Sequence, residues 1–270
     1  MKNRGYFSGV LFSIKAIKEN LVLYVPDLVF FVAAFILTFI FLQLNNLTSI
    51  FGGELIQFNS QIKSIISTTP LLLRLIISFL VLIFINLVIG LGTITVRFAM
   101  ISSIIKGEKI SLRNSLKQAH RYIFPLIWLK LSLLVIYVVP IFILLTIGIV
   151  YKPLILISIL LILILFFVFR LLFIFIYPTL FIKNVLNPVK CLQNTIIHFK
   201  QNKLGAFVVL VFVSVVGFIF SVMFAAIPLI WNNLSIFTLT SISSILYLII
   251  KTLIDISVNL WSTLFIFKNY

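Results

Sequence analysis

Ionisable side chains within long apolar stretches are the residues of this sequence whose types could carry chemistry. A charge inside a bilayer is costly, so such residues mark binding sites, ion paths or structural ion pairs. Three of them form the main candidate charge cluster: Arg170, Lys251 and Asp255. Three more lie closer to the ends of their apolar stretches, where a long side chain reaches the interface: Asp27, Arg97 and Lys130.

Two of these charges, Arg170 and Asp255, are predicted to lie at the same depth in the membrane. Arg170 lies thirteen residues before Lys183, and Asp255 lies thirteen residues before Lys268. If both lysines mark the same end of their spans, helical rise places both charges about 20 Å from that end. We therefore predict that Asp255 pairs with Arg170. Lys251 precedes Asp255 by four residues on the same helical face, so it can compete or complete a triad.

Two interpretations of these charges stay open. Ion pairing that stabilises a helical bundle, or snorkelling to the interface, explains them without any ligand. Cations outnumber acids, however, so a cation pathway is disfavoured and an anionic headgroup, whose phosphate pairs well with arginine, fits better. Under the second interpretation the chain is a lipid-handling or lipid-sensing module.

Other catalytic and metal-binding patterns are missing from the sequence. A zinc site needs more ligands than His120, His198 and the single cysteine, Cys191, supply. No acid accompanies histidine and serine at positions that would build a nucleophilic triad. We expect no catalytic residue, no metal site and no cofactor, and therefore no enzyme.

The apolar stretches define the fold class. Hydrophobic residues make up 63% of the chain and charged residues 10%, against roughly 45–50% and about 25% in soluble domains. A helical span needs roughly 20 apolar residues, and continuous apolar runs favour helices over barrel strands. We predict an all-α polytopic transmembrane helical bundle that forms a single integral membrane domain over residues 1–270. Its six predicted spans are residues 21–44, 71–105, 124–150, 154–182, 204–231 and 234–267.

Basic residues are concentrated in alternate connections. The segment before the first span and the connections after the second, fourth and sixth spans hold most of them. By the positive-inside rule both termini lie in the cytoplasm, and the protein is a multi-pass protein of the cell membrane. Because this placement accounts for the net charge of +16, we expect membrane lipids, anionic headgroups and other membrane proteins as partners, and no nucleic acid. The same orientation puts glycosylation sequons at Asn46 and Asn233 outside, although we favour chance as their origin because the motif is short.

Three basic segments also have an apolar helical face. They are Tyr6–Asn20, Ile110–Tyr122 and Pro188–His198, with apolar residues spaced by three and four. Such helices can lie in the membrane interface with lysine and arginine toward headgroups. Each precedes two spans, so we predict a threefold architectural repeat. Each also contains a small–apolar–polar triplet: Ser13–Ile14–Lys15, Ser115–Leu116–Lys117 and Cys191–Leu192–Gln193.

Three longer stretches carry a resemblance to a known family. They are Phe12–Ser13–Ile14–Lys15 through Val25–Pro26, Arg170–Leu171–Leu172–Phe173 through Tyr177–Pro178 with the helix 188–200, and Leu260–Trp261–Ser262–Thr263–Leu264–Phe265. In this order they resemble the six-helix membrane domain fused to some bacterial glycerophosphodiester phosphodiesterases, and stand-alone prokaryotic membrane proteins of that type. The resemblance implies a six-span fold and a membrane location. It does not imply phosphodiesterase activity, because the sequence has no acidic metal-binding cluster.

Three classes of function remain for such a chain. A non-enzymatic scaffold or lipid-associated membrane module is the leading hypothesis. A transporter or permease-like subunit for a lipid or small anion is the alternative, and it should show broken helices and polar stripes at the midplane. The second span offers thin support for it in Asn86, Thr93 and Thr95. A membrane enzyme is disfavoured, because no convincing acid–base pair is present.

Overall fold

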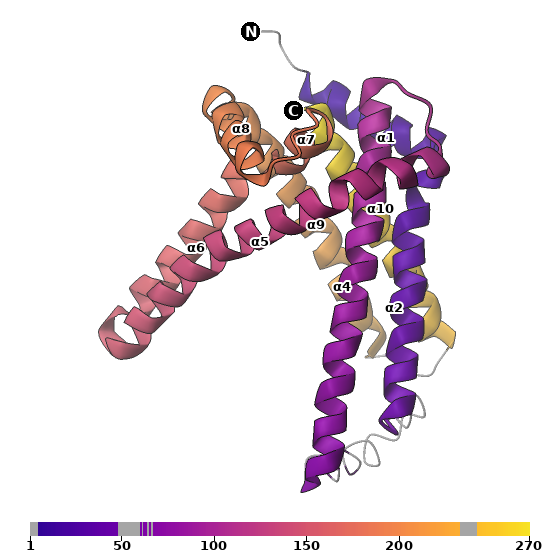
Figure 1. Cartoon of the computed structure of the whole chain (residues 1–270), viewed down its shortest axis with the longest axis vertical. Helices are drawn as coiled ribbons and strands as arrows, with labels where there is room; N and C mark the ends of the chain where they lie inside the picture. Colours follow the sequence, from indigo (N-terminus) through magenta and orange to yellow (C-terminus); the bar gives the residue numbers. More distant parts are fainter. Residues whose placement is uncertain (1–4, 48–59, 61, 64, 66, 233–241) are drawn as a thin grey trace. The chain divides into compact units, whose positions relative to one another are not determined.

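The computed structural model describes residues 5–47, 60, 62, 63, 65, 67–232 and 242–270, most of which are helical and none of which lies in a strand (Figure 1). Within these described residues, six helical segments are long and apolar enough to cross a membrane. This confirms the predicted all-α polytopic fold of a multi-pass membrane protein. The six segments are Leu21–Leu44, Thr69–Lys106, Leu112–Val150, Ile155–Phe181, Lys203–Ala225 and Leu246–Lys268.

The chain forms two compact units, each assembled from segments that are far apart in the sequence. Unit 1 contains Met1–Leu23, Thr95–Val216 and Trp261–Tyr270, whereas unit 2 contains Tyr24–Ile94 and Gly217–Leu260. The prediction of a single integral membrane domain stays a prediction.

Unit 1 is built around an antiparallel pair of helices, α5 (Leu112–Val150) and α6 (Ile155–Leu172), which run side by side (Figure 1). At their turn Gly148 lets the helices approach closely, because a Cβ there would lie 3.0 Å from the Ser158 hydroxyl oxygen. The short 3-10 helix at Lys152–Leu154 connects them. The other elements of unit 1 are α1 (Tyr6–Glu19), α7 (Ile176–Phe181), α8 (Pro188–Gln201), the end of α4 (Thr69–Lys106), the start of α9 (Lys203–Asn232) and the end of α10 (Ile242–Lys268).

Unit 2 contains the remaining, more apolar parts of the long helices. Its elements are α2 (Val25–Leu44), α4 up to Ile94, and the halves of α9 and α10 that lie outside unit 1. Two hydrogen bonds between distant segments fix α10 within it. Tyr24 and Ser257 join their hydroxyl oxygens at 2.9 Å, and the Tyr247 hydroxyl donates to the Phe224 carbonyl at 2.7 Å.

Two of the predicted segments differ in detail from the structure. The amphipathic segment 110–122 and the span that follows it form one continuous helix of 39 residues, α5, with Pro125 and Pro140 inside. The predicted span 154–182 is interrupted between α6 and α7, after Leu172. Pro178 explains this interruption, because it lacks an N–H and its ring crowds the carbonyl of residue 174, four positions earlier.

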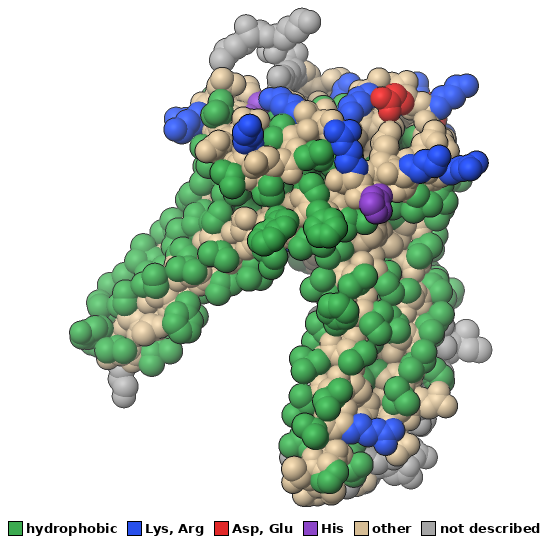
Figure 2. All heavy atoms as spheres, viewed as in Figure 1, with side chains coloured by type: hydrophobic (Ala, Val, Ile, Leu, Met, Phe, Trp, Pro, Cys, Tyr) green, Lys and Arg blue, Asp and Glu red, His purple; other side chains and the backbone are tan. Residues whose placement is uncertain are grey.

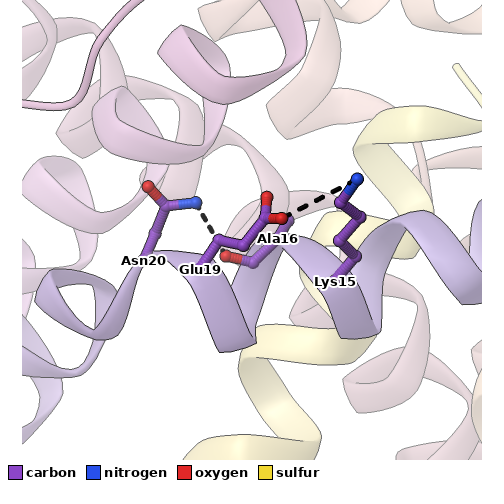
Figure 3. Close-up of polar contacts among 4 residues, drawn as sticks. All are labelled: Lys15, Ala16, Glu19 and Asn20. Carbon is purple, nitrogen blue, oxygen red and sulfur yellow. Dashed lines mark hydrogen bonds and ion pairs between the residues drawn. The ribbon is translucent and has the colours of Figure 1, made fainter.

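Helix α1 ends in a defined way before the chain enters the first span. The Asn20 side chain donates to the Ala16 carbonyl at 2.8 Å and so satisfies one of the last carbonyls of the helix (Figure 3). One turn earlier, Lys15 and Glu19 form an ion pair at 3.7 Å. Both side chains are exposed, so this pair adds little stability.

Candidate functional site

The candidate site lies in unit 1 and begins with two cations on neighbouring helices. Arg97, on α4, is only 6% exposed, and its guanidinium carbon lies 5.3 Å from the centre of the Phe98 ring. Lys130, on α5, is half-buried and lies close enough to Arg97 for the two positive charges to repel one another. Two like charges held together in this way favour an anion between them.

Two tyrosines extend this pair toward a third cation. Tyr177, on α7, lies within electrostatic range of Arg97 and packs on Phe98 with ring centres 4.7 Å apart. Tyr137, on α5, is close to Tyr177 and to Arg170 on α6. We refer to these five residues as the cation–tyrosine cluster: Arg97, Lys130, Tyr137, Arg170 and Tyr177.

Packing within the α5–α6 hairpin positions the outer half of the cluster. The Tyr137 ring meets Phe169 at 5.2 Å and Phe166 at 6.3 Å, both in edge-on geometry. Such pairs hold an aromatic ring in one orientation. Arg170 follows Phe169 directly and is exposed at the surface of α6. The tyrosine ring is therefore fixed, while the neighbouring guanidinium is accessible from outside the helix pair.

The chemistry of the cluster suits an anion with several oxygen atoms. Arginine, lysine and tyrosine hydroxyl groups all donate hydrogen bonds, and guanidinium groups bind phosphate oxygens in a bidentate manner. On α5, Tyr137 lies seven residues after Lys130, so the cluster covers about 10 Å of this helix. That length exceeds a single ion and is suited to a headgroup.

The structure brings some of the predicted charges together and separates others. Arg97, Lys130 and Arg170 all belong to unit 1. Lys251 and Asp255 belong to unit 2, where both are exposed on α10 one turn apart. The predicted pairing of Arg170 with Asp255 would join the two units, and it stays a prediction.

Asp27 has a local reason for its position in unit 2. It lies in the first turn of α2, directly after Pro26. A carboxylate there interacts favourably with the positive end of the helix dipole. Asp27 therefore stabilises the first turn of its own helix.

The two tyrosines were not among the residues predicted from the sequence. Tyr137 lies seven residues after Lys130, so both share one helical face, and this spacing could have indicated it. Tyr177 is different, because its approach to Arg97 depends on the interruption between α6 and α7. No spacing in the sequence indicates that contact.

Cys191 does not take part in chemistry of its own. It is fully buried, and its thiol lies 3.6 Å from the Ile176 carbonyl, to which it donates. Burial raises the pKa of the Cys191 thiol to about 12, so the thiol is neutral and a poor nucleophile at physiological pH.

His198 packs between the rings of Phe175 and Tyr270, at 5.2 and 4.4 Å. Within the described residues no three histidine, cysteine or acidic side chains form a group that could hold a metal.

The three basic segments share one pattern of burial. In each triplet the small residue is buried, with Ser13 and Cys191 at 0% exposure and Ser115 at 2%. The apolar residue that follows is exposed in two triplets and half-buried in the third: Ile14, Leu116 and Leu192. The small residues pack into unit 1, whereas apolar side chains stand on its outside. The faint sequence repeat thus has a structural counterpart.

Apolar and basic side chains meet at one end of unit 1. On α1, Phe7, Leu11 and Ile14 are exposed along one face. Figure 2 shows lysine and arginine side chains gathered over the end of unit 1 that contains α1 and α8, and hydrophobic side chains along the α5–α6 hairpin. We call the exposed apolar residues of the three basic segments the apolar ridges: Phe7, Leu11, Ile14, Leu112, Leu116, Val189 and Ile197.

Comparison of the chain with family models, with curated proteins and with solved structures finds no match.

Proposed function

We propose that this chain is a non-enzymatic membrane module that binds anionic lipid headgroups at the cation–tyrosine cluster of unit 1. The observation that carries the proposal is a series of neighbouring side chains that runs from Lys130 through Arg97, Tyr177 and Tyr137 to Arg170, with both tyrosine rings packed on phenylalanines. Arginine clusters are the usual partners of phosphate groups. Lipid phosphate is the abundant anion next to a membrane-spanning helix.

The apolar ridges support the same proposal. Their exposed apolar side chains would be unfavourable in water but favourable at the boundary between headgroups and acyl chains. The neighbouring lysines and arginines attract anionic lipids, at about 1 kcal/mol each near the surface. We therefore place the basic end of unit 1 at the cytoplasmic face of the cell membrane, with both termini inside, as the positive-inside rule favours.

The experiment is purification in a mild detergent, followed by mass spectrometry of the lipids that co-purify. The variants Lys130→Gln and Arg170→Gln should each lower the amount of anionic lipid per protein about tenfold. A hydrogen bond to a charged group contributes ~1.5–3 kcal/mol, and a tenfold change is about 1.4 kcal/mol. Lys200→Gln, which removes an exposed cation of α8, is the matched control and should change little. Equal effects of all three substitutions would contradict a specific site.

A transporter or permease-like role for a lipid or small anion is the second candidate, favoured by the depth of the cluster. Tyr137 lies sixteen residues beyond Arg121 along α5, or about 24 Å, which is most of the ~30 Å hydrocarbon thickness. Reconstituted vesicles with fluorescent phosphatidylglycerol in one leaflet separate the two roles. A binding module leaves the label in its leaflet, whereas a transporter redistributes it.

A further inference from the structure

Unit 2 contains an apolar groove that the candidate site does not use. It has a volume of about 500 Å³ and lies between α2 and α4. Its walls are aliphatic and aromatic side chains, and Arg74 is the one charged residue that lines it. Representative wall residues are Leu37 and Phe41 on α2 and Leu73, Ile77 and Val81 on α4.

Contacts on both sides of the groove hold the two helices apart at a fixed spacing. At one end the Asn45 amide donates to the Ser78 hydroxyl at 2.9 Å, and Phe41 meets Phe79 with ring centres 6.1 Å apart. Beyond the other end Gly90 faces Phe30, where a Cβ would lie 3.2 Å from the ring. The groove is therefore a built feature of the helix pair.

The part of the groove beyond Arg74 matches one leaflet of a bilayer. On α4 the groove is lined from Pro70 to Ile85, and Ile85 lies eleven residues after Arg74, or about 16 Å along the helix. The hydrocarbon core of a bilayer is ~30 Å thick, so half of it is about 15 Å. One acyl chain that enters beside Arg74 would thus reach from the headgroup level to the middle of the membrane.

Arg74 supplies charge at the headgroup end of the groove. It is exposed, and its guanidinium donates to the Leu44 carbonyl at 2.5 Å, which fixes its position at the end of α2. A guanidinium has five N–H donors, so others remain for a phosphate oxygen. The apolar wall selects an acyl chain, and the cation selects a negative headgroup.

We propose that this groove binds one acyl chain of an anionic glycerophospholipid, whose phosphate group lies at Arg74. The site is independent of the cation–tyrosine cluster, since all of its residues belong to unit 2. Under the proposed orientation it takes a lipid of the outer leaflet. A neutral lipid, or an apolar helix of a partner protein, could also occupy the groove, but its binding would not depend on the charge of Arg74.

The test is native mass spectrometry of delipidated protein titrated with phosphatidylglycerol and, separately, with phosphatidylcholine. Val81→Phe fills the groove, and Val88→Phe is its control on the same helix; the two valines are 50% and 51% exposed, and only Val81 lines the groove. We expect Val81→Phe to weaken phosphatidylglycerol binding at one site about tenfold, and Val88→Phe to leave it unchanged. Equal affinities in these two variants would overturn the groove as the site.

A second pair of variants tests the charge. Arg74→Gln should abolish the preference of this site for phosphatidylglycerol over phosphatidylcholine, whereas Lys63→Gln, which removes an exposed cation outside the groove, should keep it. An unchanged preference in Arg74→Gln would overturn the assignment of the headgroup, even if Val81→Phe fails to fold. Lys130→Gln, titrated in parallel, should leave this site intact, so loss of one lipid site is distinguishable from loss of the other.

Discussion

The two units differ in how their side chains pack. Unit 1 has a dense interior in which aromatic rings and hydroxyl groups from several helices meet. Phe181, for example, lies against Phe98 and Tyr122, with ring centres 5.4 and 4.5 Å apart. The Thr179 hydroxyl donates to the Tyr270 hydroxyl at 3.0 Å and accepts from the Thr195 hydroxyl at 3.2 Å. Such satisfied contacts specify one arrangement of helices.

Unit 2 instead leaves most of its large apolar side chains on the outside. On α4, Phe79, Leu80 and Phe84 are more than half exposed, and an apolar groove lies between this helix and α2. Lipid must cover these surfaces, because there is no water in the bilayer core. The comparison teaches that the interior of unit 1 is stabilised by its own side chains. Unit 2 depends on the lipids around it, as does the α5–α6 hairpin of unit 1, where Phe142 and Leu156 are 69% and 76% exposed.

The largest effect should follow from removing an aromatic ring from the interior of unit 1. Phe181 is fully buried, so Phe181→Ala should cost about 3–5 kcal/mol through lost burial and a cavity. Phe84→Ala in unit 2, where the ring is 67% exposed, should cost far less. Thermal unfolding of both variants in one detergent measures the difference. Similar losses in the two variants would remove the distinction between the units.

A second prediction concerns the charges that would join the two units. If Asp255 pairs with Arg170, the single changes Asp255→Asn and Arg170→Gln should each destabilise the protein, and the double variant should lose less than their sum. A coupling of about 0.5–3 kcal/mol is expected for interacting residues. Stability of the three variants in one detergent provides the cycle. Strict additivity would show that the two residues do not interact.

The sequence could predict those features that depend on local composition and period. The six spans follow from apolar runs longer than the hydrocarbon thickness, and the helical character of the three basic segments follows from apolar residues spaced by three and four. Arg97, Lys130 and Arg170 could be selected because charges in apolar runs are rare. These arguments need no knowledge of which helices touch.

Other features depend on contacts between distant segments and could not be predicted. The approach of Tyr177 to Arg97 requires the turn between α6 and α7, and the division into two units cuts through α4, α9 and α10. The sequence also did not predict that α5 is continuous. A proline such as Pro125 usually marks a helix end, but here it lies inside a long helix, where neighbouring groups can satisfy the backbone carbonyl that proline leaves without a partner.

A third prediction concerns substitutions on the buried and exposed faces of the basic segment at the start of α5. Ser115 is buried and Leu116 is exposed, so Ser115→Leu should overpack unit 1 and cost about 1–3 kcal/mol. Leu116→Ser should leave stability in detergent nearly unchanged. A spin label at position 116 should, however, report burial from water in vesicles. Full water exposure of labels at positions 14, 116 and 192 would contradict the placement of the apolar ridges in the membrane interface.

The smallest expected effect concerns the chemical reactivity of the single cysteine, Cys191. Because burial holds the Cys191 pKa near 12, against 9.0 for an ordinary thiol, the folded protein should contain little thiolate at pH 8. Maleimide labelling should therefore be slow until denaturant opens unit 1. The fully unfolded chain serves as the positive control. Rapid labelling of the folded protein at pH 8 would show that the core around α8 is open.

The most direct test of two separable lipid sites is a phosphatidylglycerol titration of three proteins in parallel. These are the unaltered chain, the double variant Lys130→Gln with Arg170→Gln, and Val81→Phe. We predict that each variant loses a different tight site and keeps the other, so that their losses add when the changes are combined. If the unaltered chain binds phosphatidylglycerol no more tightly than phosphatidylcholine, and neither variant changes this, the account of an anionic-lipid-binding module is wrong.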